Sequence, residues 1–175
     1  MTQWDDLGRI VIPKEIRRTL RIREGDPLKI FTGHEGEIML KKYSPVGELG
    51  GFTKEYAESL AQVSGMIVLI TDRDQFVAAA GGYKNVVGKS ITRELEDKME
   101  KRETILAGKG ERGFISVVEG MENDYLAEAI APILCEGDVI GTVLLLTQDA
   151  KTKMGEAEQR LIQSAAAFLG KQMEQ

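Results

Sequence analysis

The chain of 175 residues carries a formal net charge of −5, and its 42% hydrophobic and 29% charged residues exclude a disordered or fibrous protein. A single cysteine, Cys135, excludes an intramolecular disulfide framework and fits a reducing compartment. The first residues, MTQWDDLGR, lack the apolar stretch of a signal peptide, and the longest apolar runs, MIVLI and GTVLLL, are too short to cross a bilayer. We therefore expect a cytoplasmic protein of one or two domains with no membrane partner.

Charge is distributed unevenly along the chain. Residues 1–44 contain nine Lys and Arg against seven Asp and Glu, whereas the remainder contains 14 against 21. Such asymmetry indicates a basic binding module joined to an acidic one. The segment YSPVGELGG, rich in glycine with one proline, is typical of a linker. The sequence thus predicts a first domain at 1–43, a linker at 44–51 and a second domain at 52–175.

The first domain begins with a β-branched run at residues 10–12, which predicts a short strand. Pro13 ends this strand and suits the first turn of a helix, where its missing N–H is not needed. On that helix Ile16 and Leu20 would share one face. The other side would carry three cations, Arg17, Arg18 and Arg21.

The residues after this helix predict a β-hairpin, because apolar residues alternate on both sides of a turn at 33–36. The alternating residues are Leu28, Ile30, Ile38 and Leu40. A β-α-β-β module of about 40 residues has too small a core to be stable alone without a metal, a disulfide or a partner. The sequence offers no ligand cluster and no disulfide, so we expect a partner chain.

The cationic side of the predicted helix has two explanations. A helix with three arginines is often only a solvated surface, but here Arg9 adds a cation from the preceding turn and the rest of the protein is acidic. Cations on one surface neutralise phosphates and release counterions, which is the main source of non-specific DNA affinity. Guanidinium groups also suit bidentate contacts to phosphates and guanine edges. We therefore interpret this side as a DNA-binding surface.

The stretch DDLGRIVIPKEIRRTLRIREGDPLKIF, continued by EIMLKKY, resembles the AbrB-type swapped-hairpin DNA-binding domain over residues 5–43. In that family two chains interleave strands into one dimeric β-barrel, and arginines of the loop and helix contact DNA. The resemblance implies DNA contacts by Arg9 in LGR and by Arg17 and Arg18 in EIRRTL, with Lys14 as a weaker candidate. The continuation KKYSPVGELG resembles the sporulation regulators of this family.

The chain departs from the family pattern before Asp5. Family members carry a strand with further basic residues there, whereas only MTQW precedes Asp5 here, and none of these residues is basic. Either Trp4 packs in the dimer core and compensates for a short first strand, or the start of the chain is altered.

The second domain alternates helical and strand patterns. GGFTKEYAESLAQVSG has apolar residues at helical spacing up to Gly65, and MIVLITDRDQFVAAAG predicts a hairpin. SITRELEDKMEKRETILAG predicts a helix, and FISVVEG predicts a strand. AEAIAPILCEGDVIGTVLLLTQ predicts two strands, the second of them central because residues 143–146 are apolar on both faces. The chain ends in an amphipathic helix with apolar residues Leu161, Ile162, Ala165, Leu169 and Met173.

These elements predict an α+β sandwich. The pattern APILCEGDVIGTVLLL resembles GAF domains, which are small-molecule-sensing relatives of PAS domains, and the resemblance covers residues 52–175. GAF domains bind varied ligands and some bind none, so the resemblance names neither a ligand nor ligand-binding residues.

Three features suggest chemistry that their context does not support. GGYKNVVGKS resembles a phosphate-binding P-loop, but five residues rather than four separate Gly82 from Gly88, which would spoil the phosphate nest. We interpret this stretch as a turn capped by Ser90. His34 stands alone in a hairpin turn, and Cys135 suits a buried, inert position. We expect no metal site, no cofactor and no catalytic residue.

The sequence thus predicts an α+β transcription regulator with an AbrB-type dimeric N-terminal domain and a GAF-like sensory domain. Expected partners are DNA at the nucleoid, further copies of the chain in a dimer or tetramer, and an unidentified small molecule. For the tetramer we expect contacts through the last helix at Leu161, Ala165 and Leu169. Two alternatives remain: a ligand-free GAF-like domain that only tetramerises the regulator, and a GAF-type redox enzyme that depends on Cys135.

Overall fold

The computed structural model describes residues 5–174, and the chain divides into two compact units, residues 1–43 and 44–175. Each unit is described by itself. The expectations for residues 1–4, the short first strand and the packing of Trp4, lie outside the described residues.

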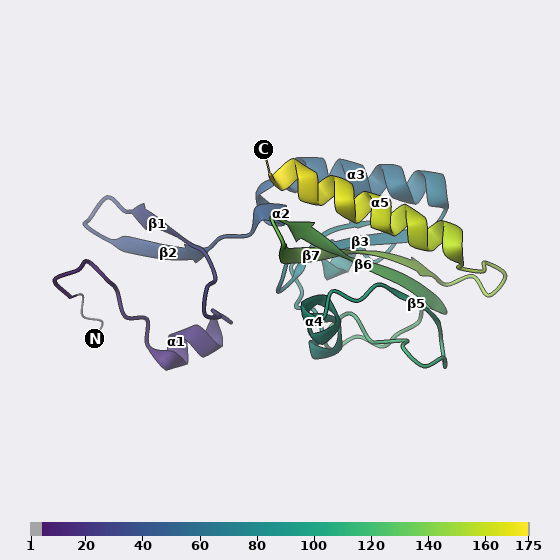
Figure 1. Ribbon diagram of the computed structural model, residues 1–175, viewed down its shortest axis with the longest axis horizontal. Coiled ribbons are helices and arrows are strands. Elements are labelled where there is room, and N and C mark those ends of the chain that lie inside the picture. Colours follow the sequence, from purple (N-terminus) through teal and green to yellow (C-terminus); the bar gives the residue numbers. More distant parts are fainter. Residues whose placement is uncertain (1–4, 175) are drawn as a thin grey trace. The chain divides into compact units, whose positions relative to one another are not determined.

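The first unit consists of one short helix followed by a hairpin (Figure 1). The predicted hairpin is confirmed, with Ile30 opposite Leu40 in the antiparallel pair. The predicted strand at residues 10–12 is not formed: Ile10 makes a single β-bridge and the next two residues are irregular. A β-branched run of three residues becomes a strand only where a neighbouring strand completes its hydrogen-bond ladder. The elements are α1 (Lys14–Thr19), β1 (Leu28–Thr32) and β2 (Ile38–Lys42).

Helix α1 ends at Thr19, two residues before Arg21, which the sequence predicted to lie on the same helix. Arg21 has a left-handed backbone with φ of 51°, and two backbone bonds close the helix, from Ile22 N–H to Arg17 O and from Arg21 N–H to Arg18 O. These two bonds are those of a Schellman motif, in which the left-handed position usually belongs to glycine.

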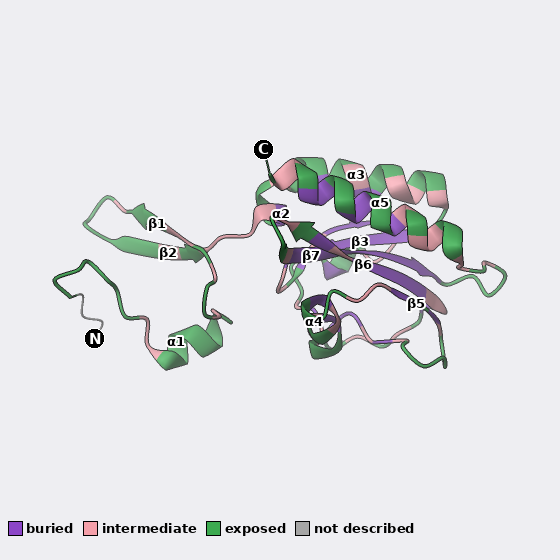
Figure 2. Ribbon diagram, in the orientation of Figure 1, coloured by how far each residue is buried: buried purple, intermediate pink, exposed green. Residues whose placement is uncertain are grey.

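The first unit buries none of its described residues in the single chain (Figure 2). Leu7 is 75% exposed and Val11 67% exposed, and Ile16 of α1 and Leu20, which follows the helix, are also exposed. The outer positions of the hairpin are also apolar and exposed, at Ile30, Phe31, Ile38 and Met39.

The second unit is built on a five-stranded antiparallel sheet with strand order β4-β3-β7-β6-β5. The predicted central position of residues 143–146 is confirmed, because β7 lies in the middle and nearly all of its residues are buried. The strands are β3 (Ile67–Thr71), β4 (Phe76–Ala80), β5 (Ile105–Gly108), β6 (Ala127–Cys135) and β7 (Asp138–Thr147).

Both faces of the sheet are covered. One face packs on α3 and α5, which run side by side across it (Figure 1), and the other packs on α4 and the segment between β5 and β6. The two apolar clusters therefore share the sheet as their common wall. The remaining elements are α2 (Pro45–Glu48), α3 (Gly50–Ser64), the short 3-10 helix η1 (Lys84–Val86), α4 (Arg93–Glu100) and α5 (Glu156–Met173).

Residues 44–51, expected as a linker, are folded onto the second unit. Ser44 caps α2 by accepting the N–H of Gly47 at 3.0 Å, and Val46 is fully buried in the cluster under α3 and α5. The Ser44 hydroxyl also donates to Asp72 Oδ2 at 2.8 Å. One apolar side chain and one capping serine are enough to fold this glycine-rich stretch.

Two predicted elements of the second unit were wrong. The predicted helix at 90–108 is helical only in α4, after which Arg102 takes a left-handed backbone and the chain continues into strand β5. The predicted strand FISVVEG is irregular apart from a bridge between Val118 and Ile91. It is extended and alternates buried with less buried residues, so its pattern imitates a strand.

Helix α5 lies unusually close to the sheet. A Cβ added at Gly170 would lie 2.0 Å from the carbonyl oxygen of Leu134 on β6. Ala165 and Leu169 are buried against the sheet, and Leu161 packs at the edge of the same cluster. The apolar residues of α5 that were expected to contact further copies of the chain therefore pack on the sheet of the same chain.

Candidate functional site

The predicted DNA-contacting residues of α1 are all exposed. Lys14 begins the helix, and Arg17 and Arg18 occupy its last turn, where cations interact favourably with the helix dipole. Neither arginine makes an ion pair with another described residue. Both guanidinium groups are thus available to an anionic surface.

Arg9 is held by a partner that the sequence analysis did not name. Its Nε donates to Asp5 Oδ2 at 2.7 Å, and a second guanidinium nitrogen lies 2.6 Å from the same oxygen. Asp5 Oδ1 also accepts the N–H of Arg9 at 3.0 Å, so the carboxylate closes the loop around Gly8. These hydrogen bonds hold the pKa of Asp5 below its usual range. Asp5 and Arg9 flank a turn, where residue spacing gives no signal for such a pair.

The loop after α1 is tied to the hairpin by Lys42. Its Nζ donates to the carbonyl oxygen of Arg21 at 2.7 Å and lies 3.3 Å from Asp26 Oδ2. The same Asp26 oxygen accepts the N–H of Arg23 at 2.9 Å and closes the turn. The hairpin thus fixes the end of the helix that carries Arg17 and Arg18. The sequence analysis missed this role of Lys42.

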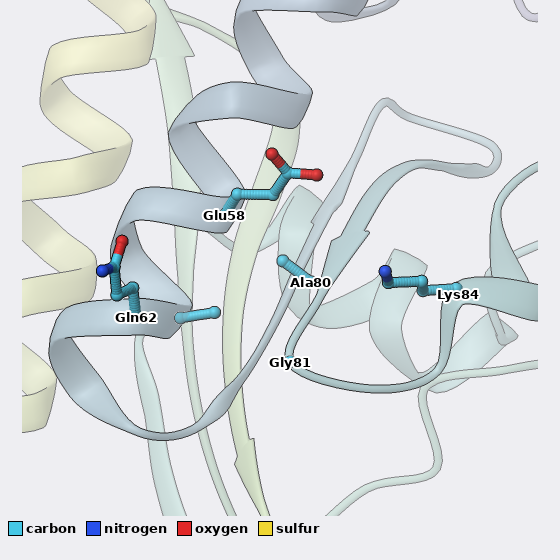
Figure 3. A pocket seen from close by; sticks show the side chains of 6 residues that line it. Glu58, Gln62, Ala80, Gly81 and Lys84 are labelled. Carbon is cyan, nitrogen blue, oxygen red and sulfur yellow. The ribbon is translucent and has the colours of Figure 1, made fainter.

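A groove lies in the second unit between α3 and the turn after β4 (Figure 3). Its volume is about 340 Å³. Glu58 and Gln62 come from α3, Gly81 from the turn and Lys84 from η1, and in Figure 3 Gln62 points away from Lys84. The groove combines opposite charges, but its polar groups do not converge on one point.

The P-loop-like stretch forms no phosphate nest. Residues 84–86 are a 3-10 helix and Gly88 has a left-handed φ of 86°. Ser90 pairs with Gln75 in a β-bridge, and Thr92, not Ser90, caps α4 by accepting the N–H of Leu95. The lone histidine, His34, is exposed in the hairpin turn.

Cys135 stands at the end of β6 and is partly exposed. Desolvation raises the pKa of its thiol, and the carboxylates of Glu136, Glu174 and Asp138 raise it further. Reactive cysteines need the opposite, an electropositive setting that stabilises the thiolate. No group of three or more metal-binding side chains occurs within residues 5–174. None of the helices described in the structure is both long enough and apolar enough to span a bilayer.

Two family models match the chain, and they meet at residue 48. Residues 1–48 match the model described as antidote-toxin recognition MazE, bacterial antitoxin. Residues 48–174 match the model described as stage V sporulation protein T C-terminal, transcription factor.

Similar curated proteins come from Bacillus subtilis. Stage V sporulation protein T is 48% identical over 172 residues, which cover 98% of this chain and 94% of the relative. The transition state regulatory protein AbrB is 58% identical over 41 residues, which cover 23% of this chain and 42% of the relative. The AbrB-type resemblance of the first unit is thereby confirmed.

Solved structures show the fold of the second unit. A GAF domain of an Acinetobacter phosphoenolpyruvate-protein phosphotransferase has a TM-score of 0.59 at 17% identity, and covers 74% of this chain and 87% of its own. A free methionine-R-sulfoxide reductase from Thermoplasma acidophilum has a TM-score of 0.58 at 12% identity, and covers 73% and 94%. These likenesses confirm the GAF-like fold predicted for the second domain. With its match along nearly the whole chain, the protein belongs to the stage V sporulation protein T family of transcription factors.

Proposed function

We propose that this protein regulates transcription during sporulation by binding DNA through Arg9, Lys14, Arg17 and Arg18 of its first unit. The observation that carries the proposal is the exposed pair Arg17 and Arg18 in a unit whose net charge is positive, in a chain that is otherwise acidic. Two guanidinium groups without competing carboxylates can each neutralise a phosphate and release its counterion. From this DNA binding we infer that the protein acts at the nucleoid, in the cytoplasm.

The test is a salt titration of DNA binding. Replacing Arg17 and Arg18 together by Ala should weaken binding more than about tenfold and reduce the slope of log K against log salt by about 2, one unit for each lost phosphate contact. Replacing Arg93 and Arg112 of the second unit by Ala removes the same charge and serves as the control, with an unchanged slope expected. An unchanged slope in the α1 variant contradicts the proposal.

The first unit supports a dimer as the DNA-binding form. Its apolar side chains are exposed in the single chain, and a unit of this size needs a further source of core. A second copy that interleaves its strands with the first would cover these residues. The AbrB-type relative supports this arrangement by its sequence similarity over the first unit.

The second unit offers a surface for joining two dimers into a tetramer. Phe52 and Phe168 are 39% and 40% exposed, and together with Tyr56 they form an aromatic cluster on α3 and α5, with ring centroids 5.2 to 6.1 Å apart. Exposed aromatic clusters are enriched in protein interfaces. This cluster replaces the buried α5 stripe as the proposed contact.

The tetramer proposal is tested by light scattering of the full chain. Replacing Phe52 and Phe168 together by Ser should convert a tetramer into a dimer at micromolar concentration. Val87, which is exposed and apolar but lies outside α3 and α5, provides the control substitution to Ser. A tetramer that persists in the double variant rules out this surface.

An unidentified small molecule is the remaining proposed partner, and the groove between α3 and η1 is the described place for it. The aromatic cluster supports the alternative role, in which the second unit only joins dimers into a tetramer, because contact through these rings requires no bound ligand. Native mass spectrometry of protein purified from cells separates the two: a bound small molecule lost on replacing Lys84 by Ala supports sensing, and ligand-free tetramers support assembly alone. A redox enzyme is not favoured, since the pKa of Cys135 is raised.

A further inference from the structure

The sheet face beneath α4 buries a carboxyl group among its apolar residues. Glu128 on β6 lies between Ala107 of β5 and Leu146 of β7, and its exposed fraction is 0%. Both neighbours belong to the apolar cluster on that face. A carboxyl group in such surroundings is strongly disfavoured as an anion unless it is paired and fully hydrogen-bonded.

Only part of the hydrogen-bonding capacity of Glu128 is used. Oε1 accepts the N–H of Ile115 at 2.7 Å, whereas the buried Oε2 has no hydrogen-bond partner among the described residues. The hydroxyl of Tyr125, also buried, donates to the carbonyl oxygen of Ile115 at 2.8 Å. Two side chains thus hold both polar backbone groups of Ile115.

Residues 114–118, here called the strap, lie outside the five-stranded sheet and are held by side-chain hydrogen bonds and by a short backbone contact, the bridge between Val118 and Ile91 and the bond from Thr92 N–H to Val117 O. Glu94 Oε2 accepts the N–H of Ser116 at 3.0 Å, and Thr92 Oγ1 donates to the carbonyl oxygen of Ser116. Thr92 is also the residue that caps α4. A segment outside the sheet that is held by a few hydrogen bonds can open without unfolding the sheet.

The charged and titratable groups around Glu128 do not offset its burial. Burial raises the pKa of Glu128 to about 7, the hydrogen bond from Ile115 and the nearby Tyr125 hydroxyl oppose this shift, and the negative charge of Glu94 adds to it. The strands on either side contribute only Ala107 and Leu146. Within the described residues, no lysine or arginine acts on the pKa of this carboxyl group.

Tyr125 couples the charge of Glu128 to the strap. The pKa of Tyr125 is raised by burial and by Glu128, so its O–H keeps its proton. A phenol has one proton to donate. In the structure that proton is directed to the carbonyl oxygen of Ile115. An ionised Glu128 attracts the same proton, and its donation there releases the carbonyl group of the strap.

We propose that Glu128 and Tyr125 form a proton-operated latch, which holds the strap closed while Glu128 is protonated and releases it when Glu128 ionises. In the open state Glu128 reaches water and regains an ordinary pKa near 4.3. The closed state binds the proton more tightly, so the equilibrium constant for opening rises with pH. It rises about tenfold per pH unit between the two pKa values and levels off above the higher one.

The experiment is amide hydrogen exchange in the full chain, corrected for the intrinsic pH dependence of exchange. Protection of the Ile115 and Ser116 amides should fall roughly 80-fold between about pH 5 and about pH 8. In Glu128→Gln, which keeps the shape and cannot ionise, protection should be independent of pH. The proposal concerns the second unit alone and does not rest on the DNA contacts.

Glu94→Gln is the matched control, because Glu94 also accepts an N–H of the strap but is exposed. It should reduce protection at every pH and keep the pH dependence, with its upper midpoint moved slightly lower because the Glu94 charge no longer raises the pKa of Glu128. Isotope-edited NMR of the Glu128 carboxyl in the unaltered protein gives a second measurement that does not need a folded variant. A midpoint near the ordinary value, or a pH dependence that survives in Glu128→Gln, overturns the proposal.

Discussion

Replacing Gly170 by Ala reverses the usual effect of this substitution in a helix. Alanine normally stabilises a helix interior by about 0.4–1 kcal/mol relative to glycine, because it has less backbone entropy to lose. At Gly170 the new Cβ would lie 2.0 Å from the carbonyl oxygen of Leu134. A normal contact between carbon and oxygen is at least about 3 Å, so α5 or β6 must move by about 1 Å.

Such overpacking costs about 1–3 kcal/mol. After the helix gain is subtracted, Gly170→Ala should lower the free energy of unfolding of the second unit by about 1–2 kcal/mol. The assay is urea unfolding followed by circular dichroism, with the m-value compared to ensure that the same transition is measured. Gly51→Ala on α3 is the matched control, since no heavy atom lies within 4 Å of its added Cβ, and it should be neutral or slightly stabilising.

A Gly170→Ala variant as stable as the unaltered protein would refute the close seating of α5 on β6. The double variant offers a further check. Because the two sites lie on different helices, the two changes in free energy should add within about 0.5 kcal/mol.

Two further substitutions test polar contacts of the second unit. Thr142→Val removes a buried hydroxyl that lies 2.7 Å from Thr71 Oγ1. It should lower the free energy of unfolding by about 1–2 kcal/mol in the same urea assay. An unchanged free energy would show that the two hydroxyl groups do not form a hydrogen bond. Ser44→Ala removes both the α2 cap and the bond to Asp72, and should cost about 1–2 kcal/mol by thermal unfolding. Ser59→Ala, on the exposed surface of α3, is the control and should change the free energy of unfolding by less than about 0.5 kcal/mol. Equal losses of stability in the two serine variants would contradict the capping role of Ser44.

Strand periodicity and glycine positions made most of the second unit predictable. The hairpin of β3 and β4 and the pair β6 and β7 follow directly from apolar runs around polar turns, and α3 ends at Gly65, whose backbone is left-handed. The error at 90–108 arose because α4 ends without glycine or proline: Arg102 takes the left-handed position instead. Arg21 ends α1 in the same way, and the sequence gives no warning in either case.

The candidate site was predictable in its cations but not in their partners. Arg17 and Arg18 follow from helical spacing, and their exposure agrees with it. The hydrogen bond from Arg9 to Asp5 and that from Lys42 to the carbonyl oxygen of Arg21 depend on the geometry of loops, which sequence periodicity does not describe. Glu128 was hidden for a different reason: a single acid in an apolar strand looks like a solvent-facing residue, and only the strap above it makes it buried.

Because no described residue of the first unit is buried, we expect the folding of this unit to depend on protein concentration. If a second copy supplies the missing core, folding and association of this unit are one bimolecular event. The folded fraction then rises with protein concentration instead of being fixed by the chain alone. Newly made chains would reach DNA-binding competence only after they accumulate to the dissociation constant of the dimer. Expression level would thereby set a threshold for regulation, even without any ligand.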